Sequence, residues 1–164
     1  METNVLYGPP GPTIEILLDD PEEHDFACAE RVLDGLSGEM AVRRPPGLPY
    51  SVAEIVAHLL ANARFNLGLI DHPDPGSYKP PMPNWSVVEA RDWEELRREY
   101  LSVLEALKQI AREQKRLDHV VYPSSDREPG WTVGYKLTCS VAKHAAYHMG
   151  QIVIIRRLLG VWDA

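Results

Sequence analysis

The sequence has few of the features that mark disulfide-rich or membrane-spanning proteins. Its two cysteines, Cys28 and Cys139, form no CxxC pair and lie among small or apolar neighbours. This pattern favours reduced core thiols over a disulfide or a zinc knuckle. No segment approaches the roughly 18 uninterrupted apolar residues of a membrane span, and the N-terminus lacks the basic and apolar regions of a signal peptide. We therefore expect a cytoplasmic protein.

Positive charge is also scarce. Seventeen Lys and Arg residues against 24 Asp and Glu residues give a net charge of -7, and the basic residues form no cluster. This balance argues against nucleic acid and anionic membranes as partners. The chain also has no Glu-x-x-His pair, which argues against a ferritin-like di-iron protein. The expected partner is a small-molecule substrate.

The sequence contains enough apolar residues to form the hydrophobic core of one domain. The chain has 164 residues, of which 45% are hydrophobic, so it can bury a proper core. Residues 1–13 are rich in proline and glycine and are interpreted as an extended N-terminal arm. We predict a single domain over residues 1–164.

The fold class predicted for the rest of the chain is all α, a single four-helix bundle. Apolar residues recur at the three- and four-residue spacing of helices, and capping residues precede most of these runs. The first predicted helix begins at Asp20 and ends at Gly35 or Gly38, and the second runs from Ser51 to just before His72. The third begins at Ser86 or Asp92 and ends near Arg116, and the fourth runs from Leu137 to Leu159.

The connection between the second and third helices is long and contains five prolines, in HPDPGSYKPPMPNWS. It cannot be a helix, and its length would let the third helix run parallel to the second. Such a crossover loop can wall a pocket, with Tyr78, Met82 and Trp85 facing substrate, or these side chains can simply pin the loop to the surface. The later segment LDHVVYPSSDREPGW is predicted to be a polar loop.

The last helix places polar groups within its apolar face. His144, His148 and Gln151 fall on the same stripe as its apolar residues. A polar group buried without a partner costs roughly 1 to 3 kcal/mol, so these imidazoles need a metal ion or hydrogen-bond partners. HxxxH offers two nitrogens to one ion but is only half of a site. Core or interface histidines satisfied by hydrogen bonds are the alternative.

Two motifs in order produce a resemblance to a known family. The segment RRPPGLPYSVAEIVAHL, a long middle region and then HAAYHMGQI resemble the DinB/YfiT family of small helical metalloproteins. The resemblance implies that His58, His144 and His148 hold a divalent metal, with Gly150 and Gln151 completing the motif. It covers nearly the whole chain and also implies the crossover topology.

Three neutral imidazoles would leave at least one coordination position open, as in catalytic sites. Zinc is the metal we expect, although nickel, iron or manganese would accept the same ligands. Gln151 is predicted to orient a ligand or the metal-bound water. Glu54 lies one turn before His58 and is a candidate general base, but its capping position explains it more simply.

The resemblance implies an enzyme of one of two kinds. Family members include thiol S-transferases and isomerases that use low-molecular-weight thiols such as mycothiol or bacillithiol, and metal-dependent hydrolases with a metal-activated water. The motif helix contains no carboxylate that would serve a hydrolase as general base, which favours the transferase. A non-enzymatic dimeric scaffold or stress-associated protein is the remaining alternative, and a homodimer is possible in each case.

Overall fold

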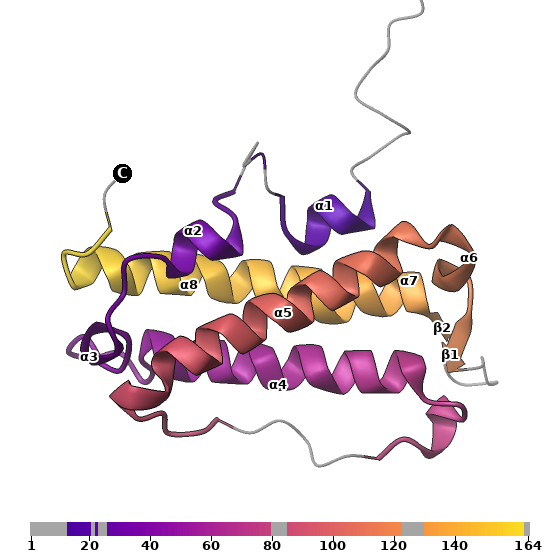
Figure 1. The fold of residues 1–164 in the computed structure, drawn as a ribbon, viewed down its shortest axis with the longest axis horizontal. Coiled ribbons are helices and arrows are strands. Elements are labelled where there is room, and N and C mark those ends of the chain that lie inside the picture. Colours follow the sequence, from indigo (N-terminus) through magenta and orange to yellow (C-terminus); the bar gives the residue numbers. More distant parts are fainter. Residues whose placement is uncertain (1–12, 21, 23–25, 80–84, 123–129, 163–164) are drawn as a thin grey trace, which may run out of the picture.

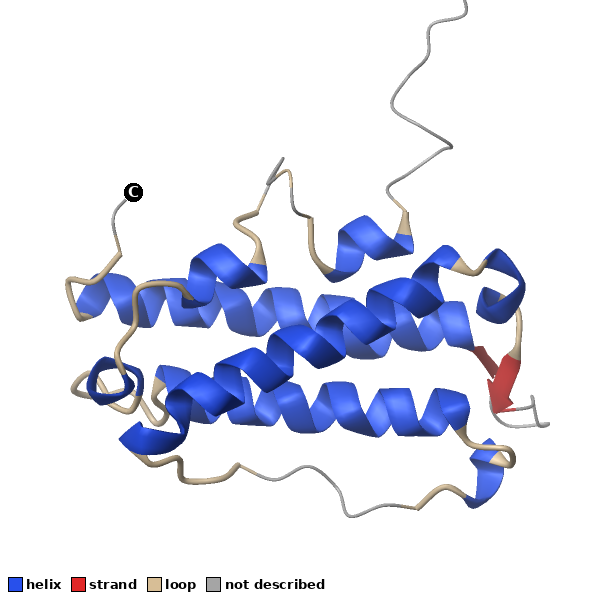
Figure 2. Cartoon of the chain, viewed as in Figure 1, coloured by secondary structure: helices blue, strands red, loops and turns tan. Residues whose placement is uncertain are grey.

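The computed structural model describes residues 13–20, 22, 26–79, 85–122 and 130–162, and it confirms the all-α fold class (Figures 1 and 2). Residues 1–12 of the predicted arm, Pro21, Glu23 and Met82 lie outside the described residues. Within the described parts of the chain, none of the helices combines the length and the apolar character needed to cross a membrane.

Three long helices form most of the bundle. They are α4 (Val52–Asp71), α5 (Trp93–Arg112) and α8 (Lys143–Leu158). Figure 1 shows α4 and α5 running in the same direction and α8 running back against them. The chain between α4 and α5, which contains η1 (Pro75–Ser77) and η2 (Ala90–Asp92), therefore returns to the end of the bundle where α4 began. This is the predicted crossover topology.

The prediction for the first helix is wrong. Two short helices, α1 (Ile14–Leu18) and α2 (Ala29–Leu33), take the fourth position of the bundle, against α5 and α8. The Asp19 carboxylate accepts a hydrogen bond from the Ala29 N–H at 2.8 Å. It thereby satisfies a buried backbone N–H in the first turn of α2, which has no partner within the helix, and α2 begins there instead of at Asp20. Phe26, which lies within the predicted helix, is outside α2 and 77% exposed.

The start of α4 matches the prediction closely. The Ser51 side chain accepts a hydrogen bond from the Glu54 N–H at 3.3 Å, and the Glu54 carboxylate accepts one from the Ser51 N–H at 2.8 Å. Both residues are buried. This reciprocal capping box sets the first turn of α4 and therefore the direction in which α4 presents its side chains.

The third predicted helix is divided in two. The helix α5 starts at Trp93, directly after the predicted alternative start Asp92, and the short helix α6 (Gln114–Leu117) follows a break at Glu113. Trp93 is fully buried, and its indole N–H donates to the Leu36 carbonyl at 2.8 Å. That bond ties the start of α5 to the chain after α2. A further short helix, α3 (Gly38–Ala41), precedes the loop that leads to α4.

The C-terminal helical stretch begins earlier than predicted and contains a wider turn. It runs from α7 (Val133–Tyr135) through the π-helical segment η3 (Lys136–Ala142) into α8. Before it, β1 (Val120–Tyr122) and β2 (Trp131–Thr132) pair antiparallel, where a loop was predicted. Cys139 in η3 is exposed, so the prediction of a core thiol is wrong at this position.

The core lies between these elements. Its largest fully buried side chains come from α2, α4, α5, η3 and α8: Leu33, Ile55, Leu69, Trp93, Tyr100, Leu107, Leu137 and Ile152. Burying an aliphatic side chain contributes roughly 1.5 to 3 kcal/mol. The packing of these residues therefore supplies the stability that holds α4 and α8 at a defined separation.

We expect Ser51→Ala to lower the free energy of unfolding by about 1 kcal/mol, because it removes the side-chain acceptor of a buried N-cap. The measurement is the urea midpoint followed by circular dichroism. Ser102→Ala, at an exposed position inside α5, is the matched control and should leave the midpoint unchanged or slightly higher. Equal midpoints for Ser51→Ala and the parent would contradict the capping role.

Candidate metal centre

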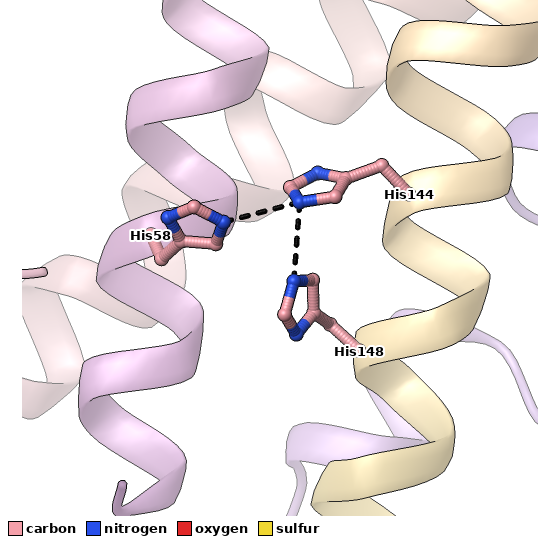
Figure 3. Close-up of side chains that lie close together, drawn as sticks. All are labelled: His58, His144 and His148. Carbon is pink, nitrogen blue, oxygen red and sulfur yellow. Dashed lines mark hydrogen bonds between the residues drawn. The ribbon is translucent and has the colours of Figure 1, made fainter. Parts of the chain in front are cut away.

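Three histidines from two helices meet inside the bundle. His58 comes from α4, and His144 and His148 come from successive turns of α8 (Figure 3). The Nε2 atom of His144 lies 3.1 Å from Nε2 of His58 and 3.1 Å from Nε2 of His148. One ligand atom from each ring lies within 4.8 Å of the other two. The structure thus brings together the three residues that the sequence motifs singled out.

This spacing fits a metal ion better than it fits hydrogen bonding alone. Zinc–nitrogen distances of about 2.0 to 2.1 Å in a tetrahedron imply nitrogen–nitrogen separations of about 3.3 Å, close to the two 3.1 Å separations observed. The Nε2 of an imidazole carries either one proton or one lone pair. His144 therefore cannot donate to both neighbours, whereas a cation can accept a lone pair from all three rings.

The environment keeps the three rings neutral. Burial, and then the nearby His148 and His58 rings, lower the pKa of His144 to about 4. Burial also lowers the pKa of His58, with a further contribution from His148. The pKa of His148 is lowered by burial, against an opposing effect of its hydrogen bond with Gln151. Neutral imidazoles at pH 7 have the free lone pairs that a metal requires.

Gln151 lies beside His148, one turn further along α8. Its Oε1 is 2.7 Å from Nδ1 of His148. Because an amide oxygen only accepts hydrogen bonds, this contact places the proton of His148 on Nδ1 and leaves the Nε2 lone pair facing the other histidines. The geometry suits a residue that orients a metal-ligating imidazole by hydrogen bonding to its other ring nitrogen.

Glu54 is engaged in contacts that set the start of α4. Arg44 binds its carboxylate through two guanidinium nitrogens, with the Nε to Oε2 distance at 2.8 Å, and Ser51 donates a backbone N–H. The hydrogen bond from Arg44 is the main reason why the pKa of Glu54 lies below its usual value. These contacts favour the capping interpretation over the general base.

Aromatic rings border the three histidines. The Trp85 indole stacks on the His58 ring, with centroids 4.3 Å apart and planes 9° apart. Tyr147 lies edge-on to His148 at 5.1 Å and is 65% exposed. The sequence predicted Trp85 only as one possible wall of the pocket, because a contact between the crossover and α4 leaves no local pattern.

Tyr78, the other aromatic residue predicted for the pocket wall, lies elsewhere along α4. It packs against Phe65 and His72, at 5.7 and 5.3 Å between ring centroids. This matches the alternative that an aromatic residue pins the crossover loop to the bundle.

The lowered pKa values predict how the stability of the metal-free protein depends on pH. Below about pH 6.5 the unfolded chain binds more protons on these histidines than the folded chain does, so stability falls as the pH drops toward 4. Urea midpoints of chelator-treated protein at pH 7.5, 6 and 5 measure this. His144→Gln removes the group with the lowest pKa and should lose less stability over this range than the parent. Identical losses in parent and variant would contradict the prediction.

A comparison with family models identifies the chain's relatives. A model described as mycothiol-S-transferase matches residues 23–160, which include the three histidines and Gln151. No curated protein and no solved structure gave a significant match. The match confirms the resemblance to DinB/YfiT-like proteins. Because it covers most of the sequence, the protein belongs to the mycothiol-S-transferase family.

Proposed function

We propose that this protein is a divalent-metal-dependent S-transferase that joins the sulfur of a low-molecular-weight thiol, mycothiol, to an electrophilic small molecule. The observation that carries the proposal is the convergence of three neutral imidazole nitrogens in a member of this family. His58, His144 and His148 would hold the ion. A divalent ion, when bound, supplies positive charge that stabilises a thiolate near neutral pH.

The protein's own residues suit this chemistry. Three uncharged ligands do not offset the charge of a divalent cation, so the centre keeps its full attraction for an anionic sulfur. Three protein ligands, not four, are typical of a centre that also accepts a substrate atom. Gln151 keeps the proton of His148 on Nδ1, so that Nε2 stays available as a ligand. Burial of the rings strengthens each of these electrostatic effects.

The hydrolase alternative finds less support. It requires a general base, and Glu54 was the candidate. Both oxygens of Glu54 are engaged, one by Arg44 and the other by Arg44 and Ser51. A carboxylate stabilised in its charged form by an arginine is a weak base. The transferase therefore remains the favoured reaction.

Zinc stays the predicted metal, because zinc sites are commonly tetrahedral with nitrogen ligands. Nickel, iron and manganese accept the same donor set. The cytoplasmic location and the homodimer also stay predictions.

Elemental analysis of protein purified without nickel-affinity chromatography tests the metal centre. We expect about one divalent ion per chain in the parent and none in His58→Ala or His148→Ala, because each variant removes one of three ligands. His119→Ala, in the segment between α6 and β1, is the control that should keep the ion. A folded parent that stays metal-free at micromolar ion would refute the centre.

Activity is tested by following the loss of mycothiol in the presence of an activated aryl or alkyl halide. The His148→Ala rate should fall by a factor of roughly 100 or more, toward the uncatalysed rate, because an oriented metal ligand is lost. If the mycothiol concentration stays constant while ester or amide substrates are hydrolysed, the result would instead support the hydrolase.

Gln151→Leu should weaken metal affinity by a factor of about 10 to 100, which is the usual effect of removing a hydrogen-bond partner of a metal-ligating histidine. Chelator competition measures this affinity. Gln109→Leu, at an exposed position on α5, is the matched control and should bind as the parent does. Parental affinity in Gln151→Leu would show that the contact with His148 does not orient the ring.

A further inference from the structure

The Nδ1 side of the His58 ring makes no hydrogen bond with the described residues, and only its Nε2 has a polar neighbour, Nε2 of His144 at 3.1 Å. The Nδ1 atom of His58 is buried. Histidines that bind metals almost always donate this second N–H to a carboxylate, a carbonyl or a water. His148 follows the rule through Gln151. Rotation about χ2 of a histidine is broad and shallow, so a packing contact against the flat face of His58 would restrict its plane.

A stack of three aromatic rings provides that interaction. Trp85 lies flat on His58, with centroids 4.3 Å apart and an interplanar angle of 9°. Tyr50 lies flat on the opposite face of the indole, at 3.6 Å and 7°. Turning the His58 ring about χ2 would push its edge into the indole face. The indole also meets His148 edge-on, at 5.9 Å and 72°.

The stack links separate parts of the chain. Tyr50 directly precedes Ser51, the N-cap of α4, and Trp85 belongs to the end of the crossover that leads to η2 and α5. The indole is thus held between a ring fixed by the capped start of α4 and a ring on the second turn of α4. A residue of the crossover therefore sets the position of a candidate ligand.

We propose that Trp85 is a positioning residue for the metal centre. Its indole holds His58 in the plane that directs Nε2 toward His144 and His148, in place of a hydrogen bond from Nδ1 of His58, which has no partner among the residues that the structure describes. This inference rests on the proposed function, in which the three histidines bind a divalent ion. It makes metal affinity depend on a crossover residue that is not itself a ligand.

The test compares the parent with Trp85→Leu, Trp85→Phe and Trp131→Leu. Two quantities are measured: zinc affinity by chelator competition, and the visible absorption spectrum of the cobalt-loaded protein, which reports how the imidazoles are arranged around the ion. Trp85→Leu keeps an apolar side chain but loses the stack. We expect zinc binding weakened by a factor of about 10 to 100 and a changed cobalt spectrum. Trp85→Phe keeps a flat ring and should restore most of both.

Trp131→Leu is the matched control. Trp131 also makes ring contacts, with Tyr122 and Tyr135, but at the hairpin end of the molecule. The Trp131→Leu variant should have the same zinc affinity and the same cobalt spectrum as the parent. If Trp85→Leu does not fold, Tyr50→Leu replaces it, since releasing the outer face of the indole should change the spectrum in the same direction.

Two results would overturn the inference. A Trp85→Leu protein with the parental zinc affinity and cobalt spectrum would make Trp85 only a wall of the site. Weaker binding with a parental spectrum and a lower urea midpoint would mean that Trp85 acts through general stability alone. The proposed function would survive either result as long as the parent binds metal and His58→Ala does not. A parent that binds neither ion would refute both.

Discussion

The candidate site depends above all on the antiparallel packing of α4 against α8. His58 sits on one helix and His144 and His148 on the other, so only this packing brings the three Nε2 atoms together. Ile55 and Ile152, fully or nearly fully buried residues of these two helices, contribute roughly 1.5 to 3 kcal/mol each. The Nδ1 atoms of His58 and His144 are buried and find no hydrogen-bond partner in the described part of the chain, which costs roughly 1 to 3 kcal/mol apiece. The apolar core is large enough to offset that cost.

Charge within the site is arranged so that its ligands stay neutral. Burial lowers the pKa of all three rings, and neighbouring rings lower the pKa of His58 and His144 further. Glu54, one turn before His58 on α4, is paired with Arg44. An ion at this position would therefore keep most of its positive charge for a thiolate, which is the property that an S-transferase requires. The Ser51 N–H that closes the capping box and the Arg44 guanidinium together engage both oxygens of Glu54, which favours a capping role for this residue.

Local signals predicted some elements well and others poorly. The capping box of Ser51 and Glu54 and the three-four spacing located α4, because both operate within one or two turns. The first helix failed because a contact between Asp19 and Ala29, ten residues apart, determines where α2 begins. The π-helical turn over Lys136–Ala142 was missed because a uniform angle per residue cannot represent it. The wider turn also helps to explain why Cys139 is exposed.

The sequence by itself determined the chemistry that is available: two histidines four residues apart on one helix, a glutamine one turn further along, and a third histidine on an earlier helix. Helix geometry places His144 and His148 together without help from the rest of the fold. Only the tertiary structure decided that His58, 86 residues from His144, meets them. It also decided that Trp85, from the end of the crossover, stacks on His58. Those contacts join distant segments, and periodicity, which is local, carries no information about which distant segments meet.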